Sequence, residues 1–337
     1  MEIGKKIRQS GKLLMTRTKS GLKNFAQLVY PKSDMVMVSK DTYLAGGNNT
    51  YIRYVGPATF RFIISIANGQ TYTLPILGNL TFSTLSNDIV VDWGEGAEET
   101  TLQEGRTITA QDLEHTYSLL SSSEEEQVTI TIIATRGVIP HFKANNRILK
   151  VLDPLPSFDP YTTYYTSAKG MFWVYANLSN LEEIPSDLFK NNPQITDFSQ
   201  CFQGTKIAEL PQGILDYSKN NVINCLDLVK ANTSLTTIPS DLFSKVKPSC
   251  LVSAFEGCSN LTTYINANTF FGDLSHCDNS LTLKGIQRMF EDCSLSTGDA
   301  NAFVNVVGNS SFGAYHSGAL NGCSLWDGWA DIDSSWK

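Results

Sequence analysis

The chain has 337 residues, of which 42% are hydrophobic and 18% charged, and this is enough for two or three compact domains. Its formal net charge of −7 argues against a nucleic-acid-binding role for the body of the protein. No apolar run reaches the ~18 residues of a membrane span. Nor is the basic start followed by the apolar stretch of a secretory signal.

Residues 1–57 form a basic N-terminal arm. The first 24 residues contain seven Lys or Arg and one acid, Glu2. The arm is either a solvated helix or mobile chain, or an anchor that docks on a larger assembly, and we expect the anchor. Further along, residues 35–38 predict a short strand and residues 46–49 a turn. The expected anchor residues are Lys5, Lys6, Arg8, Lys12 and Arg17.

Residues 58–136 predict an all-β domain. Residues 59–66 are rich in β-branched and aromatic side chains, and the Asn68-Gly69 pair that follows predicts a hairpin to a strand at 71–76. Residues 88–93 form another apolar run that ends in a glycine-rich turn. Residues 127–134 alternate between apolar and polar, as a half-buried strand does.

A family resemblance supports this β domain. The segment from Val91 to Gly96 reads V-D-W-G-E-G, and His115-Thr116-Tyr117 follows, then the alternating strand. These residues resemble the polycystic-kidney-disease type of immunoglobulin-like domain, although Glu95 replaces the family's usual Asp. The resemblance implies a β-sandwich with Trp93 in the core and the Tyr117 hydroxyl on a backbone partner. Gly94 and Gly96 suit a tight hairpin turn with positive φ.

Residues 137–170 are rich in Pro and Tyr and read as a junction, in which residues 148–152 resemble a degenerate first repeat. Residues 171–307 contain an internal repeat of the form L-x-x-[IL]-P-x-x-[LI]-[FL]. Its copies start 26, 28 and 26 residues apart (207 − 181, 235 − 207 and 261 − 235). We expect their first residues to share a buried position; these are Leu181, Ile207, Leu235 and Leu261.

The repeat has the period of a leucine-rich repeat, in which each unit supplies a short strand and a return segment. Met171-Phe172, Met289-Phe290 and the segment from Phe255 to Leu261 match phrases of the type M-F-x-x-C-x-x-L. They resemble the irregular leucine-rich repeats of bacterial surface proteins. The resemblance implies a solenoid.

All seven cysteines lie between Cys201 and Cys323, and no two are spaced as C-x-x-C. The odd count does not fit a disulfide framework, so we expect buried free thiols, no zinc site and no cofactor.

Residues 308–337 hold three tryptophans and have two interpretations. They are either a cap that closes the solenoid or an exposed aromatic platform for sugars. The platform residues would be Trp326, Trp329 and Trp336.

The expected fold class is therefore mainly β with short helices, an immunoglobulin-like β-sandwich plus a leucine-rich-repeat solenoid. No catalytic motif is present in the sequence, so we expect no enzyme. The combination of domains is similar to surface proteins of gut bacteria and their phages.

The resemblance implies a phage virion structural protein, a head or tail fibre or a decoration. Residues 1–56 would bind capsid, portal or tail proteins, and the solenoid would bind a glycan or protein of the host surface. We expect a homo-oligomer, although no heptad run supports a trimer. The alternative is a bacterial cell-surface adhesin of leucine-rich-repeat type, with its signal peptide removed. An intracellular scaffold is a third interpretation.

Overall fold

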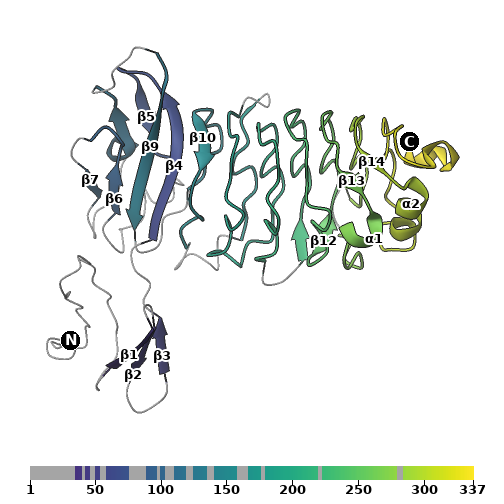
Figure 1. Cartoon of the computed structure of the whole chain (residues 1–337), viewed down its shortest axis with the longest axis horizontal. Coiled ribbons are helices and arrows are strands. Elements are labelled where there is room, and N and C mark those ends of the chain that lie inside the picture. The colour runs from purple at the N-terminus through teal and green to yellow at the C-terminus, as the bar shows by residue number, and fades with distance from the viewer. Residues whose placement is uncertain are drawn as a thin grey trace.

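The computed structural model describes most of the chain, and the described part is mainly β (Figure 1). Of the expected arm at residues 1–57, the first 34 residues lie outside the described residues. The described residues are 35–39, 42–45, 50–53, 58–75, 89–96, 99–102, 110–118, 124–134, 140–157, 166–175, 179–218, 222–278 and 284–337.

Three short strands come first and form an antiparallel sheet in the order β1-β2-β3. They are β1 (Met35–Ser39), β2 (Thr42–Ala45) and β3 (Thr50–Arg53). The strand predicted at 35–38 is confirmed. The turn predicted at 46–49 lies outside the described residues, between two strands that pair antiparallel.

A five-stranded antiparallel sheet follows, in the order β10-β4-β9-β6-β7. Its long central strands alternate as expected, because Phe60, Phe62 and Ile64 point into the core while Arg61 points out and binds Asp153. The strands predicted at 59–66, 88–93 and 127–134 are confirmed. The strands are β4 (Ala58–Ile66), β6 (Ile89–Asp92), β7 (Thr100–Leu102), β9 (Glu126–Ala134) and β10 (Ile148–Val151).

A second sheet consists of β5 (Thr71–Thr73) and β8 (Glu114–Thr116), the latter preceded by a 3₁₀ helix at Ala110–Leu113. The predicted hairpin at Asn68-Gly69 is therefore wrong. Both edges of β4 are occupied, by β9 and β10, so the turn instead carries the chain from one sheet to the other.

The two sheets meet around Trp93 and Tyr117, which are both buried. The Tyr117 hydroxyl donates to the Trp93 carbonyl over 3.1 Å, which confirms the expected backbone partner. His115 stacks on the Trp93 ring and contacts the Glu95 carboxylate at 2.7 Å. The β6–β7 turn is thereby tied to β8.

Strand β10 links this sheet to the rest of the chain. It pairs with β4 on one side, and Lys150 forms a parallel bridge with Glu183 on the other. The sheet thus extends past the boundary expected at residue 136. Residues 148–151 serve as its edge strand and also contact the first repeat.

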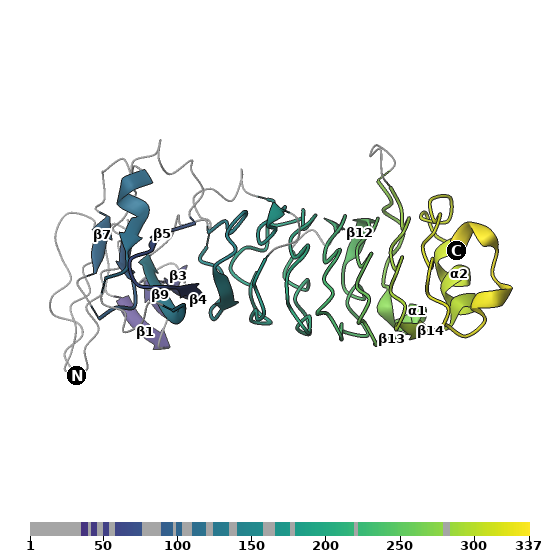
Figure 2. The same cartoon turned by 90° about the horizontal axis from the view of Figure 1, so that it is seen from above.

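From here to the C-terminus the chain winds in coils that lie side by side along the long axis (Figures 1 and 2). Backbone N–H groups of one coil donate to carbonyls of the next. For example, the N–H groups of Phe172, Phe202 and Phe255 donate to the carbonyls of Cys201, Leu228 and Met289, respectively. The regular elements described in this part of the chain are β11 (Val222–Asn224), β12 (Lys247–Cys250), β13 (Tyr264–Ile265), β14 (Thr297–Gly298), α1 (Ala267–Phe270), α2 (Ala300–Gly308) and 3₁₀ helices at Trp329–Asp331 and Ser334–Trp336.

One buried side chain per coil occupies the same place in this hydrogen-bond ladder, and we call these the ladder residues. Phe142, Phe172 and Phe202 stack with ring centroids 5.3 and 5.7 Å apart. Phe142 also contacts Phe62 of β4, so the core runs from the sheet into the coils without interruption. The ladder residues are Phe142, Phe172, Phe202, Val229, Phe255, Phe290 and Leu320.

Left-handed backbone conformations flank the ladder residues on both sides. They let the ladder residue point inward and the next residue outward. Many of them are not glycine, including Gln200, Asp227 and Arg288. The positions are Gly170, Gln200, Asp227, Ser253, Arg288 and Gly318 before the ladder residue, and Ala144, Gly204, Ala231, Gly257, Asp292 and Gly322 after it.

Cysteines fill a further buried column. Cys258, Cys293 and Cys323 each lie three residues after a ladder residue and donate to a carbonyl of the preceding coil. Burial raises the pKa of the Cys258 and Cys323 thiols to about 12. All seven cysteines are free thiols; the expected burial is confirmed for six, and Cys277 is half-buried.

The four equivalent repeat positions, Leu181, Ile207, Leu235 and Leu261, are all buried, as predicted. We expect Leu235→Ala to lower the free energy of unfolding by about 2–5 kcal/mol, because it leaves a cavity in the core. Leu295, which is 45% exposed, provides the matched control. Leu295→Ala should change stability by less than about 0.5 kcal/mol. Equal effects in urea denaturation would contradict the assignment of the inward face.

Substitutions at two glycines distinguish the cost of a strained backbone from the cost of a steric clash. Gly69 and Gly94 both have φ near +82°, but a Cβ at Gly94 would lie 2.4 Å from the Thr129 carbonyl, whereas one at Gly69 meets nothing within 4 Å. Gly69→Ala should cost about 1–2 kcal/mol from φ alone. Gly94→Ala should cost about 1–3 kcal/mol more, measured as a lower urea midpoint. If the two variants unfold at the same midpoint, the close approach of the turn to β9 is refuted.

Candidate functional site

The residue after each ladder residue points outward, and together these residues form a line along the stack that we call the outer strip. Equivalent backbone bonds fix its register, because Ala144 donates to Trp173, Gly204 to Lys230 and Ala231 to Glu256. Neighbouring members are separated by about one strand spacing, ~4.8 Å. The strip consists of Lys143, Trp173, Gln203, Lys230, Glu256, Glu291 and Asn321.

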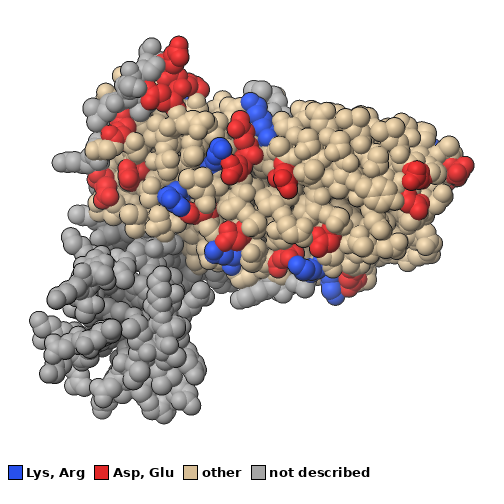
Figure 3. Space-filling model, in the orientation of Figure 1, with Lys and Arg blue, Asp and Glu red and all other residues tan. Residues whose placement is uncertain are grey.

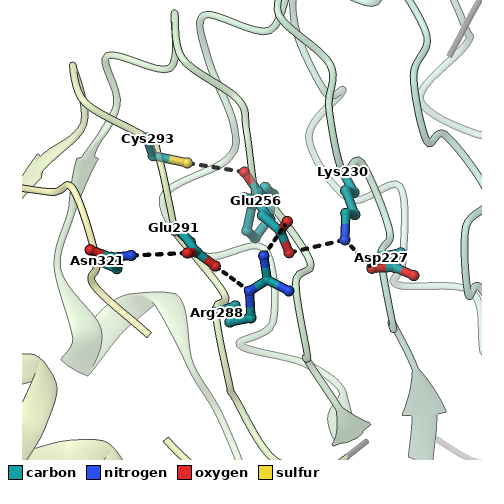
Figure 4. A network of polar contacts seen from close by, with 8 residues as sticks. Asp227, Lys230, Glu256, Arg288, Glu291, Cys293 and Asn321 are labelled. Atoms are coloured by element: carbon teal, nitrogen blue, oxygen red, sulfur yellow. Dashed lines mark hydrogen bonds and ion pairs between the residues drawn. The ribbon is translucent and has the colours of Figure 1, made fainter. Parts of the chain in front are cut away.

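A continuous polar network covers the C-terminal half of the strip (Figure 4). Lys230 lies between two carboxylates, 3.5 Å from Asp227 and 3.0 Å from Glu256. Arg288 donates to Glu256 over 2.8 Å and also binds Glu291, which accepts from Asn321 over 2.9 Å. The network thus joins the side chains of four successive coils.

The acids of this network are more buried than the cations above them. The side chains of Asp227, Glu256 and Glu291 are 13 to 17% exposed, whereas that of Arg288 is 51% exposed. Burial raises the pKa of Asp227, although Lys230 opposes the shift. Burial also acts to raise the pKa of Glu291, but hydrogen bonds from Arg288 and Asn321 outweigh it and leave that pKa below its ordinary value. Ion pairs with Lys230 and Arg288 orient the carboxyl groups of all three acids.

The N-terminal half of the strip is aromatic and amide in character. The Lys143 ammonium lies 5.3 Å from the centre of the Trp173 ring. Tyr175, two residues further on, is 79% exposed. On the next coil, the Oε1 atom of Gln203 is buried and has no hydrogen-bond partner within the described part of the chain.

Opposite charges are interspersed along the stack. On the face drawn in Figure 3, cations of the coils lie beside acids rather than in a separate patch, and acids gather at the end that holds the sheet. The coils on this face therefore do not concentrate charge of one sign, in contrast to the end that holds the sheet.

The tryptophans of the predicted platform do not form an exposed surface. Trp326 is buried against Phe290 and Phe303, with its N–H donating to Ser296. Trp336 is buried as well and stacks on His316. The platform is wrong for these two because residues 334–337 fold back onto the last coil, where the Leu320 N–H donates to the Trp336 carbonyl.

Trp329 is partly buried. Its N–H donates to the Leu320 carbonyl, and Lys337 lies over its ring. The three tryptophans therefore act together to close the end of the core.

The predicted anchor residues Lys5, Lys6, Arg8, Lys12 and Arg17 lie outside the described residues. Among the residues that are described, no group of His, Cys, Asp and Glu side chains is arranged to hold a metal ion. In the same part of the chain, no helix has the length and apolarity needed to cross a membrane.

The outer strip was not predicted from the sequence. Its members vary in type, from Trp173 through Gln203 and Lys230 to Glu256, so they share no motif. The only available signal was position, because Glu256 and Glu291 both follow the Phe of an F-E-x-C phrase.

Comparisons with protein families, curated proteins and solved structures find no match to this chain.

Lys230 provides a test of the network. Lys230→Met removes the cation between two largely buried carboxylates and should cost about 1–3 kcal/mol of stability at pH 7. Without Lys230, the pKa of Asp227 rises further above its ordinary value. An acid with a raised folded-state pKa binds more protons folded than unfolded, so stability falls as pH rises between the ordinary and the raised value. The deficit of the variant should therefore shrink as pH is lowered through that window.

Lys245→Met is the matched control for this prediction. Lys245 pairs with Asp216 at 2.5 Å, but its side chain is 62% exposed. Loss of such a surface pair should cost no more than about 1 kcal/mol. Thermal melts of both variants across acid and neutral pH provide the measurement. A deficit in Lys230→Met that does not depend on pH would show that the network leaves Asp227 unperturbed.

Proposed function

We propose that the chain is a non-enzymatic structural protein of a phage virion, a head or tail fibre or a decoration protein. Residues 1–56 attach it to capsid, portal or tail, and the C-terminal part displays a surface that binds the host. In this proposal residues 58–151 form an immunoglobulin-like β-sandwich of the polycystic-kidney-disease type. The coils that follow form a leucine-rich-repeat solenoid.

Specific contacts support each part of the proposed architecture. The Trp93–Tyr117 hydrogen bond joins the segments that carry the family resemblance. Buried residues at the same position of successive repeats, such as Leu235 and Leu261, are what a leucine-rich repeat requires.

The observation that carries the functional proposal is the uninterrupted core from β4 to Trp336. Phe62 contacts Phe142, Phe142 stacks on Phe172, and buried side chains continue to the C-terminal cap. A hinge needs a place where few contacts cross, and the core formed by the described residues offers none between the sheet and the coils. The described body is therefore suited to hold a binding surface on the coils at a fixed position relative to the N-terminal sheet.

The charge distribution of the sequence supports attachment through the arm. Seven cations in the first 24 residues contrast with a net charge of −7 for the whole chain. Such an arm would be attracted to an acidic site on a particle, and salt would weaken the attraction.

Deletion of residues 1–24 in the phage tests the anchor. We expect the truncated protein to be absent from purified particles, as judged by quantitative mass spectrometry. The control keeps the arm at full length but replaces Lys5, Lys6, Arg8, Lys12 and Arg17 by Gln. Its occupancy should fall, and it should depend less on salt than the occupancy of the wild type, because most of the screened charges are gone. Wild-type occupancy after the deletion would refute the anchor, and display of the protein on bacteria that carry no phage would favour a cell-surface adhesin.

A further inference from the structure

We propose that the outer strip binds an uncharged glycan that lies across the coils from Trp173 to Glu256. The inference rests on the proposed role in host attachment and names the ligand class and the side chains that bind it. Its basis is an aromatic ring, an amide and oriented carboxylates at the same position of successive coils.

The aromatic contribution comes from Trp173 and Tyr175. The indole of Trp173 is partly exposed beside Lys143, and the Tyr175 side chain is 79% exposed. Large aromatic side chains on a surface combine an apolar face with a polar edge. The C–H groups on one face of a sugar ring stack on such a surface, while its hydroxyls remain free to bond at the edge.

The amide contribution comes from Gln203, which occupies the position of Trp173 on the next coil. Its Oε1 atom is buried and has no hydrogen-bond partner among the described residues. An unsatisfied buried acceptor costs about 1–3 kcal/mol. Gln203 as a whole is half-buried, and an outward turn of its side chain exposes this atom. The amide then offers both a donor and an acceptor to a sugar hydroxyl.

The charged contribution sums to zero. The strip and the two network residues beside it, Asp227 and Arg288, carry three cations, Lys143, Lys230 and Arg288. They also carry three carboxylates, Asp227, Glu256 and Glu291. Such a surface does not attract a polyanion such as nucleic acid or a sulfated glycan. Its carboxylates are oriented by ion pairs and still have lone pairs for hydroxyl donors, so little reorganisation opposes binding.

The spacing of the strip favours a polymer over a small molecule. Equivalent side chains recur with each coil, about every 4.8 Å. An extended chain of sugars that crosses the coils therefore meets a new side chain of the strip at each coil. Extended surfaces of this kind are the usual binding sites of stacked-repeat proteins.

The test uses the full chain on an array of uncharged, sialylated and sulfated oligosaccharides, followed by calorimetric titration with the best uncharged one. Trp173→Ala and Gln203→Ala should each raise Kd at least about tenfold, equivalent to about 1.4 kcal/mol. The control is Tyr264→Ala. Tyr264 is 52% exposed but lies on β13, away from the strip, so its loss should leave Kd unchanged. Gln203→Ala removes an unsatisfied buried acceptor and should not lower the melting temperature, which separates a loss of binding from a loss of folding.

Three outcomes overturn the inference: no uncharged glycan bound, only acidic glycans bound, or equal Kd values for wild type and both strip variants. If the protein binds a protein receptor of the host instead of a sugar, no uncharged glycan on the array will bind. Each leaves the anchor experiment untouched, since a particle protein that binds no sugar still fails to assemble without its arm. Conversely, the protein could bind an uncharged glycan and yet never join a phage particle. That result would refute the virion proposal but still support glycan binding by the outer strip.

Discussion

Each coil of the stack leaves backbone N–H and C=O groups pointing along the long axis, and buried groups of this kind must find partners. Only the neighbouring coil can supply them, as it does for Phe172, Phe202 and Phe255. This constraint fixes the register of one coil on the next. The stacking of the phenylalanines, the column of cysteines and the alignment of the outer strip all depend on that register. At the C-terminus, the Trp336 carbonyl accepts the hydrogen bond from the Leu320 N–H of the last coil.

The same constraint explains why the sheet and the coils share a core. Strand β10 pairs with β4 on one side, and on the other side its Lys150 forms a bridge with Glu183 of the first repeat. At this point the first coil covers the edge of the sheet. Phe142 then fills the space between Phe62 and Phe172. The sheet thus acts as the N-terminal cap of the stack, as the tryptophans cap its other end. Stacked repeats need such caps because their end faces are apolar.

Sequence patterns predicted those features of the fold that depend only on the periodicity of nearby residues. The alternation in residues 127–134 and the spacing of Leu235 and Leu261 depend on the period of the chain alone, and both predictions are confirmed. The hairpin at Asn68-Gly69 was wrong because the partner of β5 is set by segments far away in the sequence. The burial of Trp326 depends on Gly298 of the preceding coil, where a Cβ would lie 2.8 Å from the ring, and no pattern reveals that fit. The outer strip was missed because left-handed positions occupied by Gln200, Asp227 and Arg288 carry no glycine to mark them.

The ladder also bears on how the chain reaches this structure. Before the last coil, its bonds join residues 25 to 34 positions apart, as from Asp227 to Val252 (252 − 227) and from Ser253 to Gln287 (287 − 253). Loop-closure entropy grows with loop length, so these short loops close at a low entropic cost. Pairing of β4 with β9 spans a longer loop, from Ile66 to Glu126 at its shortest. Although the protein is mainly β, its coils can therefore add one at a time at low loop-closure entropy, and closure of the N-terminal sheet is the slower event.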